Sequence, residues 1–221
     1  MTPIDLLRRE LSRNGARPLL TWYDDSAGAR IELSVATTAN WVAKIAGFLT
    51  DEHDLGPGDR VTVELPLHWQ APCALLAVWA CGAAVCLDSS GEVTIGTSPS
   101  SDLVVGTDPM GVELSRLVGA QPDDFAPLVP VDGSALALRA EGRQWTHDEL
   151  GAAASRSAAH HAIGSTSRVL TTMGFDSVDG IDAGLLVPLA AGASIVLVTN
   201  ADPSRLAERR AAEQVTDTFL R

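Results

Sequence analysis

The apolar segment at residues 72–87 constrains the fold of this chain more than any other feature of the sequence. It is almost wholly hydrophobic and is interrupted inside only by Gly82. A helix needs about 20 apolar residues to cross a bilayer, so this segment is too short to span a membrane. Because glycine often ends helices, the pattern predicts a buried helix over residues 69–81 that leads into a buried strand over residues 84–87.

The three cysteines of the chain, Cys73, Cys81 and Cys86, all lie within this apolar segment. Their number is odd, no pair has C-x-x-C spacing, and no histidine stands beside them at the spacing of a metal site. We therefore expect buried free thiols and no metal site.

The charge of the chain is strongly acidic. It carries 28 Asp and Glu residues against 16 Lys and Arg, a formal net charge of -12, and no basic cluster offsets this locally. Such a surface repels phosphate groups, so we exclude nucleic acid and anionic membranes as partners. The N-terminal stretch is interleaved with charges from Asp5 to Glu10 and lacks the apolar core of a secretory signal, which predicts a cytoplasmic protein.

Strands and helices are predicted to alternate along the chain, whose 46% hydrophobic composition is enough for a substantial core. Apolar alternation and turn signals predict strands over residues 19–23, 29–33, 60–65, 93–95, 103–105, 135–138, 168–172 and 194–198. Helical periodicity predicts helices over residues 5–11, 35–49, 69–81, 111–118, 147–161, 179–190 and 203–215. Ser34 and Asp202 are predicted N-caps, and Thr146 with Glu149 is a predicted capping box. The short connections predict an α/β fold with mostly parallel strands.

The stretch at residues 119–132 is the best linker in the chain. It contains Pro122, Pro127 and Pro130 and has no helical or strand periodicity. We expect a junction between two lobes near it.

Three segments share their order and spacing with one known family. They are the helix region at residues 33–49 with Gly-Pro-Gly-Asp-Arg-Val at 56–61, the stretch at 74–83, and the strand, helix and Gly-Ala strand entry at 168–197. In this order they resemble the L-T-Y helix and G-x-x-x-G-D-x-V turn, the L-A-x-x-x-x-G-A stretch, and the L-x-x-G-A strand of one domain. That domain is the N-terminal domain of the AMP-binding superfamily, the acyl-adenylate-forming enzymes, which include acyl-CoA synthetases, luciferase and adenylation domains.

The resemblance implies an α/β fold of two stacked lobes, with mostly parallel sheets and flanking helices. One lobe would span about residues 60–160, and the other would combine residues 1–55 with 165–221. The resemblance also implies a truncated N-terminal domain, since the family's adenine and ribose contacts and its swinging domain with the catalytic lysine have no counterpart before Arg221.

Departures from the family pattern bear on the function. Before Thr146, the family carries a Ser/Thr/Gly-rich loop ending in P-K-G that wraps the ATP phosphates, whereas residues 139–145 here offer one glycine and the repelling Glu141. Residues 174–177 stand where the family has P-x-x-H. We therefore expect no catalytic residue and no cofactor, and a non-catalytic role is favoured over an enzyme.

Arg139, Gly142 and Arg143 remain a candidate anion site beside the helix at 147–161, with a surface ion pair to Glu141 as the alternative.

Other groups of titratable residues have plain structural interpretations. Asp176, Asp179 and Asp182 gather near the position of the family's acyl pocket, where solvated carboxylates at a helix start are favoured over a cation site. The residues from His147 to Glu149 are interpreted as the first turn of a helix, and His160 and His161 as its end.

Three functional hypotheses from different classes follow. The favoured one is a non-catalytic homologue of AMP-binding enzymes that binds a small acyl or nucleotide-like ligand or a protein partner. The second is part of a split AMP-dependent ligase that needs another polypeptide, and the third is a structural homo-oligomer without a ligand.

We also predict a homodimer, because the strand at residues 194–198 would be an uncovered sheet edge if the chain stops after the helix at 203–215.

Overall fold

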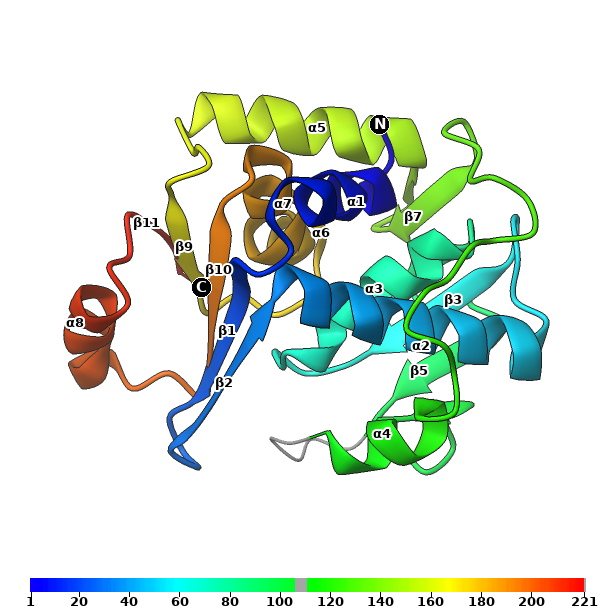
Figure 1. The fold of residues 1–221 in the computed structure, drawn as a ribbon, viewed down its shortest axis with the longest axis horizontal. Helices are drawn as coiled ribbons and strands as arrows, with labels where there is room; N and C mark the ends of the chain where they lie inside the picture. Colours follow the sequence, from blue (N-terminus) through cyan, green and yellow to red (C-terminus); the bar gives the residue numbers. More distant parts are fainter. Residues whose placement is uncertain (106–110, 221) are drawn as a thin grey trace.

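The computed structural model describes residues 1–105 and 111–220. Residues 106–110 and Arg221, which belong to the two lobes predicted from the sequence, lie outside the described residues. The described strands form two sheets (Figure 1). One sheet has the order β11-β9-β10-β1-β2 and is built from β1 (Pro18–Asp24), β2 (Ala29–Ser34), β9 (Arg168–Thr171), β10 (Ser194–Thr199) and β11 (Asp217–Phe219). The other has the order β6-β5-β3-β4-β7-β8 and is built from β3 (Arg60–Glu64), β4 (Ala84–Cys86), β5 (Val93–Gly96), β6 (Leu103–Val104), β7 (Leu136–Ala140) and β8 (Arg143–Thr146).

Both sheets are parallel except at one hairpin each. The β1–β2 and β7–β8 pairs are antiparallel, and all other pairs are parallel. The α/β fold with mostly parallel sheets is confirmed.

Helices fill the space between and around the sheets (Figure 1). They are α1 (Pro3–Asn14), α2 (Val35–His53), α3 (Gln70–Ala80), α4 (Val112–Val118), α5 (His147–His160), α6 (Val178–Ile181), α7 (Val187–Ala191) and α8 (Pro203–Ala212). The α5 helix contacts β7 and β8 of one sheet as well as α7, which covers the other, and α1 packs against α2, α3, α5 and α7. These helices join the two sheets into one core.

The apolar segment forms the centre of this core, as predicted. Every residue of α3 is buried, and the Nε1 of Trp79 donates a hydrogen bond of 2.8 Å to the carbonyl of Ala137. Cys73, Cys81 and Cys86 are buried free thiols. Gly82 has a φ of 77° and forms the turn from α3 into β4, which confirms its predicted place.

The predicted helix caps are confirmed. Ser34 caps α2, Asp202 caps α8, and Thr146 and Glu149 form the capping box of α5. A second capping box, between Thr2 and Asp5 at the start of α1, was not predicted from the sequence.

Two expectations at the C-terminal end are wrong. The last helix ends at Ala212 instead of residue 215, and the chain returns as β11, which pairs with β9. The β10 strand, expected to be an uncovered edge, lies between β9 and β1. The N-terminal segment covers it, so the edge on which the predicted homodimer rested does not exist.

The helix expected over residues 179–190 is also different. It divides into α6, a π-helical turn (Asp182–Leu186) and α7, and the Val187 N–H bonds to the carbonyl of Asp182, five residues earlier. Pro188 explains the break, because a proline inside a helix removes one N–H donor and its ring clashes with the preceding turn. Within the described residues, no helix is long and apolar enough to cross a membrane.

Candidate functional site

A cleft lies where the carboxyl ends of strands from the two sheets come together. Two adjoining cavities, of about 380 and 460 Å³, share the residues Leu65, Pro66 and Asp176. The larger is lined by the ends of β3 and β4, and the smaller by the end of β10 and by the segment after β9. The crevice beyond the carboxyl ends of parallel strands is where α/β proteins generally bind ligands.

One wall of the cleft is the segment that follows β3. The Nε1 of Trp22, a buried side chain of β1, lies 3.0 Å from the carbonyl of Leu67 and 2.9 Å from the Oγ1 of Thr199. The Thr199 hydroxyl also donates to the carbonyl of Leu67. These hydrogen bonds connect the segment after β3 of one sheet to β1 and to the end of β10 of the other.

The opposite wall rests on the π-helical turn. Phe175, which is buried, lines the cleft, and a Cβ placed on Gly184 of that turn would lie only 3.0 Å from its ring. Glycine at this position therefore permits the close approach of the turn to the aromatic ring. Asp182 begins the same turn, and burial, with a smaller contribution from Asp179, raises the pKa of its carboxyl group to about 6.

The charges of the cleft are all negative. Among the described residues that line the two cavities, Glu64 and Asp176 carry charge, and no Lys or Arg is present. The remaining lining combines apolar side chains with hydroxyl and amide groups, including Thr199 and Asn200. Such a site can hold an apolar or neutral polar molecule, whereas an anion meets repulsion there.

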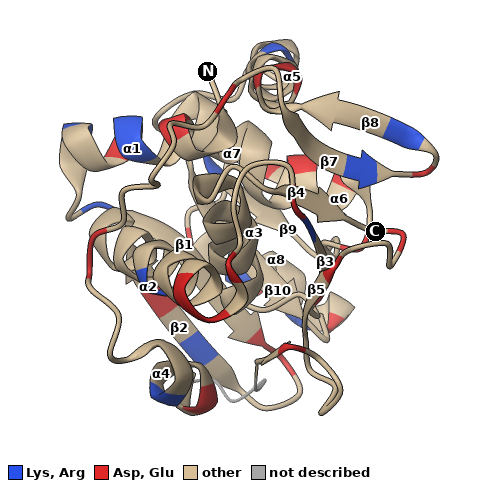
Figure 2. Cartoon of the chain, turned by 90° about the vertical axis from the view of Figure 1, so that its right-hand side faces the viewer, with Lys and Arg blue, Asp and Glu red and all other residues tan. Residues whose placement is uncertain are grey.

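The structure does not bring the arginines of the candidate anion site together. Arg139 lies on β7 and Arg143 on β8, so each strand of the hairpin carries a basic position (Figure 2). Arg143 pairs with Ala140, so its side chain lies on the same face of the hairpin as that of Ala140. Because neighbouring residues of a strand point to opposite faces, the Arg139 side chain lies on the other face. Arg139 forms an ion pair of 2.9 Å with Asp88, and the guanidinium group of Arg143 lies 4.7 Å above the ring of Trp145.

Gly142 is one of the two residues in the turn of this hairpin. Glu141 and Gly142 have φ values of 54° and 73°, which is the left-handed conformation that a tight hairpin turn requires. The residues expected to form a loop thus form a hairpin, and β8 was missed by the sequence analysis because Glu-Gly is a weaker turn signal than Asn-Gly or Asp-Gly.

The other titratable candidates are dispersed. Asp176 lines the cleft, whereas Asp182 begins the π-helical turn and His161 contacts the ring of Phe219. Among residues 1–105 and 111–220, no group of three or more His, Cys, Asp or Glu side chains is arranged to hold a metal ion. The residues that shape the cleft, such as Leu67 and Thr199, carry no motif; the only signal for them is their place at the ends of predicted parallel strands.

Comparison with known proteins places the chain in a family. No protein-family model matches it. A TIGR03089 family protein of Mycobacterium tuberculosis (strain ATCC 25618 / H37Rv) is 38% identical over 219 residues, an alignment that covers 90% of each chain.

Solved structures show the same fold at lower identity. The N-terminal domain of FACL13 from Mycobacterium tuberculosis superposes with a TM-score of 0.77 at 16% identity, over 99% of this chain and 62% of that chain. An acyl-CoA synthetase from Brucella canis superposes with a TM-score of 0.79 at 14% identity, over 100% of this chain and 47% of that chain. This chain therefore spans about half to three fifths of the length of these structures. It belongs to the TIGR03089 family, and its fold is that of the N-terminal domain of the acyl-adenylate-forming enzymes.

Proposed function

We propose that this chain is a cytoplasmic, non-catalytic homologue of the AMP-binding enzymes, and that it binds a small uncharged ligand in the cleft between its two sheets. The observation that carries the proposal is the charge of the cleft, where Glu64 and Asp176 are the charged lining residues among those described. A nucleotide or a free carboxylate would enter this cleft against two negative charges.

The β7–β8 hairpin supports the same conclusion. A loop that cradles a triphosphate needs successive unobstructed main-chain N–H groups and usually a lysine. Here the two strands pair up to Ala140 and Arg143, and only Glu141 and Gly142 remain in the turn. The segment therefore offers a carboxylate where the family resemblance places a phosphate loop.

The lining also suggests the chemical class of the ligand. The apolar side chains of Leu65, Leu67 and Phe175 suit a hydrocarbon portion, and the hydroxyl and amide groups of Thr199 and Asn200 suit an uncharged polar head. An acyl group in amide or ester form matches this combination.

Calorimetric titration with ATP and AMP tests the proposal directly. We expect no measurable binding of either nucleotide, with or without Mg²⁺, to the full chain. ATP binding with micromolar affinity would contradict a non-catalytic role. The variants Glu141→Lys and Glu141→Gly should also show no exchange of pyrophosphate into ATP, since altering one turn residue does not create a phosphate cradle.

Thermal-shift measurements with octanamide and octanoate test the ligand class, because a ligand that binds only the native state raises its apparent stability. The amide should raise the melting temperature and the carboxylate should not. In the double variant Glu64→Gln/Asp176→Asn the difference between the two should shrink, whereas the control Glu208→Gln, an exposed position on α8, should leave it unchanged. Equal shifts by both compounds in the unchanged protein would contradict the assignment.

A further inference from the structure

A second surface, far from the strand ends that form the cleft, lies along the segment between α4 and β7. Residues 122–131, here called the strap, cross the face of α2 in an extended path (Figure 1). We propose that the strap and the groove beside it form a docking site for a segment of a protein partner that carries both apolar and basic side chains.

The groove is apolar inside. A cavity of about 510 Å³ lies between the strap and the C-terminal end of α2, and its apolar lining includes Leu55, Pro57 and Phe125. On the strap itself, Leu128 is 96% exposed and Val129 is 56% exposed. Two adjacent apolar side chains exposed beside an apolar groove are typical of a surface that another molecule covers.

The strap is fastened at its beginning. The Nζ of Lys44 donates a hydrogen bond of 2.5 Å to the carbonyl of Gln121 and forms an ion pair of 2.9 Å with Asp123. Phe125 packs against the main hydrophobic core. The exposure of Leu128 and Val129 therefore occurs on a segment that is held against the body of the protein.

The main chain of the strap has polar groups that are not paired within the chain. Counting only the described residues, the carbonyl groups of residues 122–131 and the N–H groups of the seven that are not proline take part in no hydrogen bond within the chain. Main-chain groups of an extended segment can bind an extended peptide, and the side chains of that peptide then provide the specificity.

The charge of the groove determines the kind of partner. Asp51, Asp54 and Asp124 line it, all three are exposed, and none forms an ion pair with another described residue. The groove also lies at the C-terminal end of α2, where the helix dipole adds partial negative charge. Basic groups on a partner would complement these three carboxylates. A second copy of this chain, with its net charge of -12, would instead bring like charges to them.

Fluorescence anisotropy with short labelled peptides tests the proposal on the full chain. A peptide in which Leu and Lys alternate should bind, and peptides with Glu in place of Lys or Ser in place of Leu should bind at least about tenfold more weakly, a difference of about 1.4 kcal/mol. The triple variant Asp51→Asn/Asp54→Asn/Asp124→Asn should lower the affinity for the Leu/Lys peptide by about tenfold or more. Leu128→Ser should also lower it, and folding should be unaffected because this side chain is exposed.

Matched controls separate a site from general attraction to an acidic protein. The triple variant Glu113→Gln/Glu141→Gln/Glu208→Gln removes the same charge from exposed positions elsewhere, and Leu220→Ser removes an apolar side chain that is 53% exposed. Both controls should change the affinity by less than about twofold. Absence of binding, equal binding of the Lys and Glu peptides, or equal losses in the two triple variants would each overturn the proposal. Concentration-dependent dimerisation that Leu128→Ser abolishes would identify a second copy as the occupant and would overturn it as well.

Discussion

Single residues in this protein help to connect elements that are distant in the sequence, and the Glu10 carboxylate does so through Arg9. Its buried carboxylate lies 3.0 Å from Arg9, 3.1 Å from Arg13 and 3.2 Å from Arg17. Arg9 in turn donates hydrogen bonds of 3.0 and 2.8 Å to the carbonyls of Leu189 and Ala190 at the end of α7. The carboxylate thus positions the arginine that joins α1 to the other side of the core.

Replacing this carboxylate should lower stability. We expect Glu10→Gln to decrease the free energy of unfolding by about 3 kcal/mol, because partly buried arginines lose the charge that compensates them. Urea denaturation followed by circular dichroism measures the change. The control Glu208→Gln, at an exposed position, should have a midpoint close to that of the unchanged protein, and an equally stable Glu10→Gln would show that the arginines find other partners.

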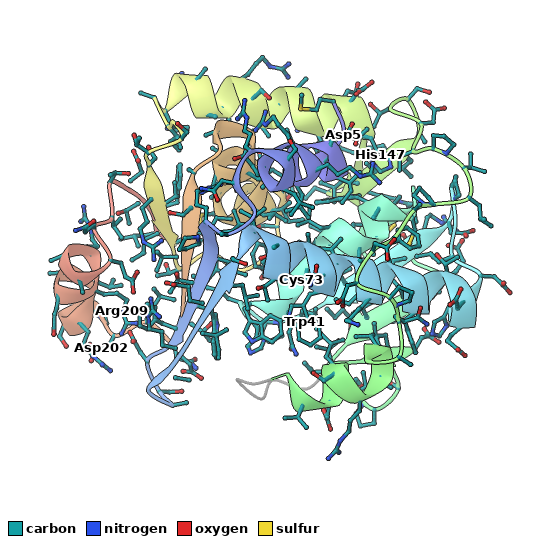
Figure 3. The ribbon with its side chains drawn as sticks, in the orientation of Figure 1. Asp5, Trp41, Cys73, His147, Asp202 and Arg209 are labelled. Carbon is teal, nitrogen blue, oxygen red and sulfur yellow. The ribbon has the colours of Figure 1, made fainter. Side chains whose placement is uncertain are left out.

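His147 is a buried titratable group at the start of α5, near Asp5 of α1 (Figure 3). Its ring is fully buried, and neither nitrogen has a hydrogen-bond partner of good geometry among the described residues. Burial lowers the pKa of His147, while the Gly82 main chain and the carboxylates of Asp148, Asp132 and Asp5 oppose the shift without cancelling it. The unfolded chain therefore binds a proton more readily at this position than the folded chain does.

This difference predicts a loss of stability in acid. The contribution of neutral His147 is complete above the unfolded pKa of about 6.5 and is lost as the pH falls below it. We expect His147→Leu to lose less stability than the unchanged protein between about pH 7.5 and 5.5, the range in which an ordinary histidine titrates. Urea midpoints of both proteins at the two pH values check this. Parallel losses would mean that other groups account for the acid sensitivity.

Asp182 has the opposite pH dependence. Burial, and to a smaller extent Asp179, raises the pKa of Asp182 in the folded chain from 3.8 to about 6. Between pH 3.8 and about 6 the folded chain therefore binds more protons at this position than the unfolded chain does. The stability contribution is therefore present at low pH and is lost as the pH rises through about 6. We expect Asp182→Asn to raise the free energy of unfolding at neutral pH by about 2 kcal/mol, and to do so much less in acid. A variant with the same gain at both pH values would contradict this assignment.

At the scale of elements, the connection from α3 to β4 depends on one backbone conformation. Gly82 has a φ of 77°, and a Cβ at this position would lie 3.3 Å from the Pro57 side chain. We expect Gly82→Val to lower the free energy of unfolding by about 2 kcal/mol, because a β-branched residue is strained at positive φ. The melting temperature should fall by roughly 4–8 °C, whereas Gly82→Asn should cost less because asparagine tolerates this conformation. An unchanged melting temperature in Gly82→Val would show that the turn adopts another conformation.

The elements that the sequence predicted are those specified by local signals. The buried α3 helix follows from the apolar run, and α2 and α5 follow from their caps at Ser34 and Thr146. In contrast, β8 and β11 are short strands with weak periodicity, and β11 exists because β9 offers it an edge for pairing. The π-helical turn had a local signal in Pro188, but that signal marks a disruption without specifying which kind.

At the scale of the whole molecule, the walls of the candidate site carry no sequence motif, and only their place at the ends of predicted parallel strands pointed to them. Its walls come from Leu67, Phe175 and Thr199, which the pairing of the two sheets brings together from separate parts of the chain. The anion site predicted from Arg139 and Arg143 relied on closeness in sequence, and strand alternation sends those side chains to opposite faces. Self-association remains a prediction, now without the β10 edge that motivated it, and sedimentation equilibrium is the measurement that addresses it.

The pairing of β1 with β10 also sets the order in which the chain can acquire its structure. Leu20 is in register with Ile195, so one side of β1 has no partner until the segment around Ile195 has left the ribosome. The strands of the other sheet all lie between Arg60 and Thr146, and they can pair while the C-terminal region is still being synthesised. Contacts between distant segments form slowly, so we expect the β3–β8 sheet to gain protection from hydrogen exchange first during refolding. Until β10 arrives, the apolar edge of the β1–β2 hairpin stays available to other chains, and nascent copies of this protein are exposed to aggregation through that edge.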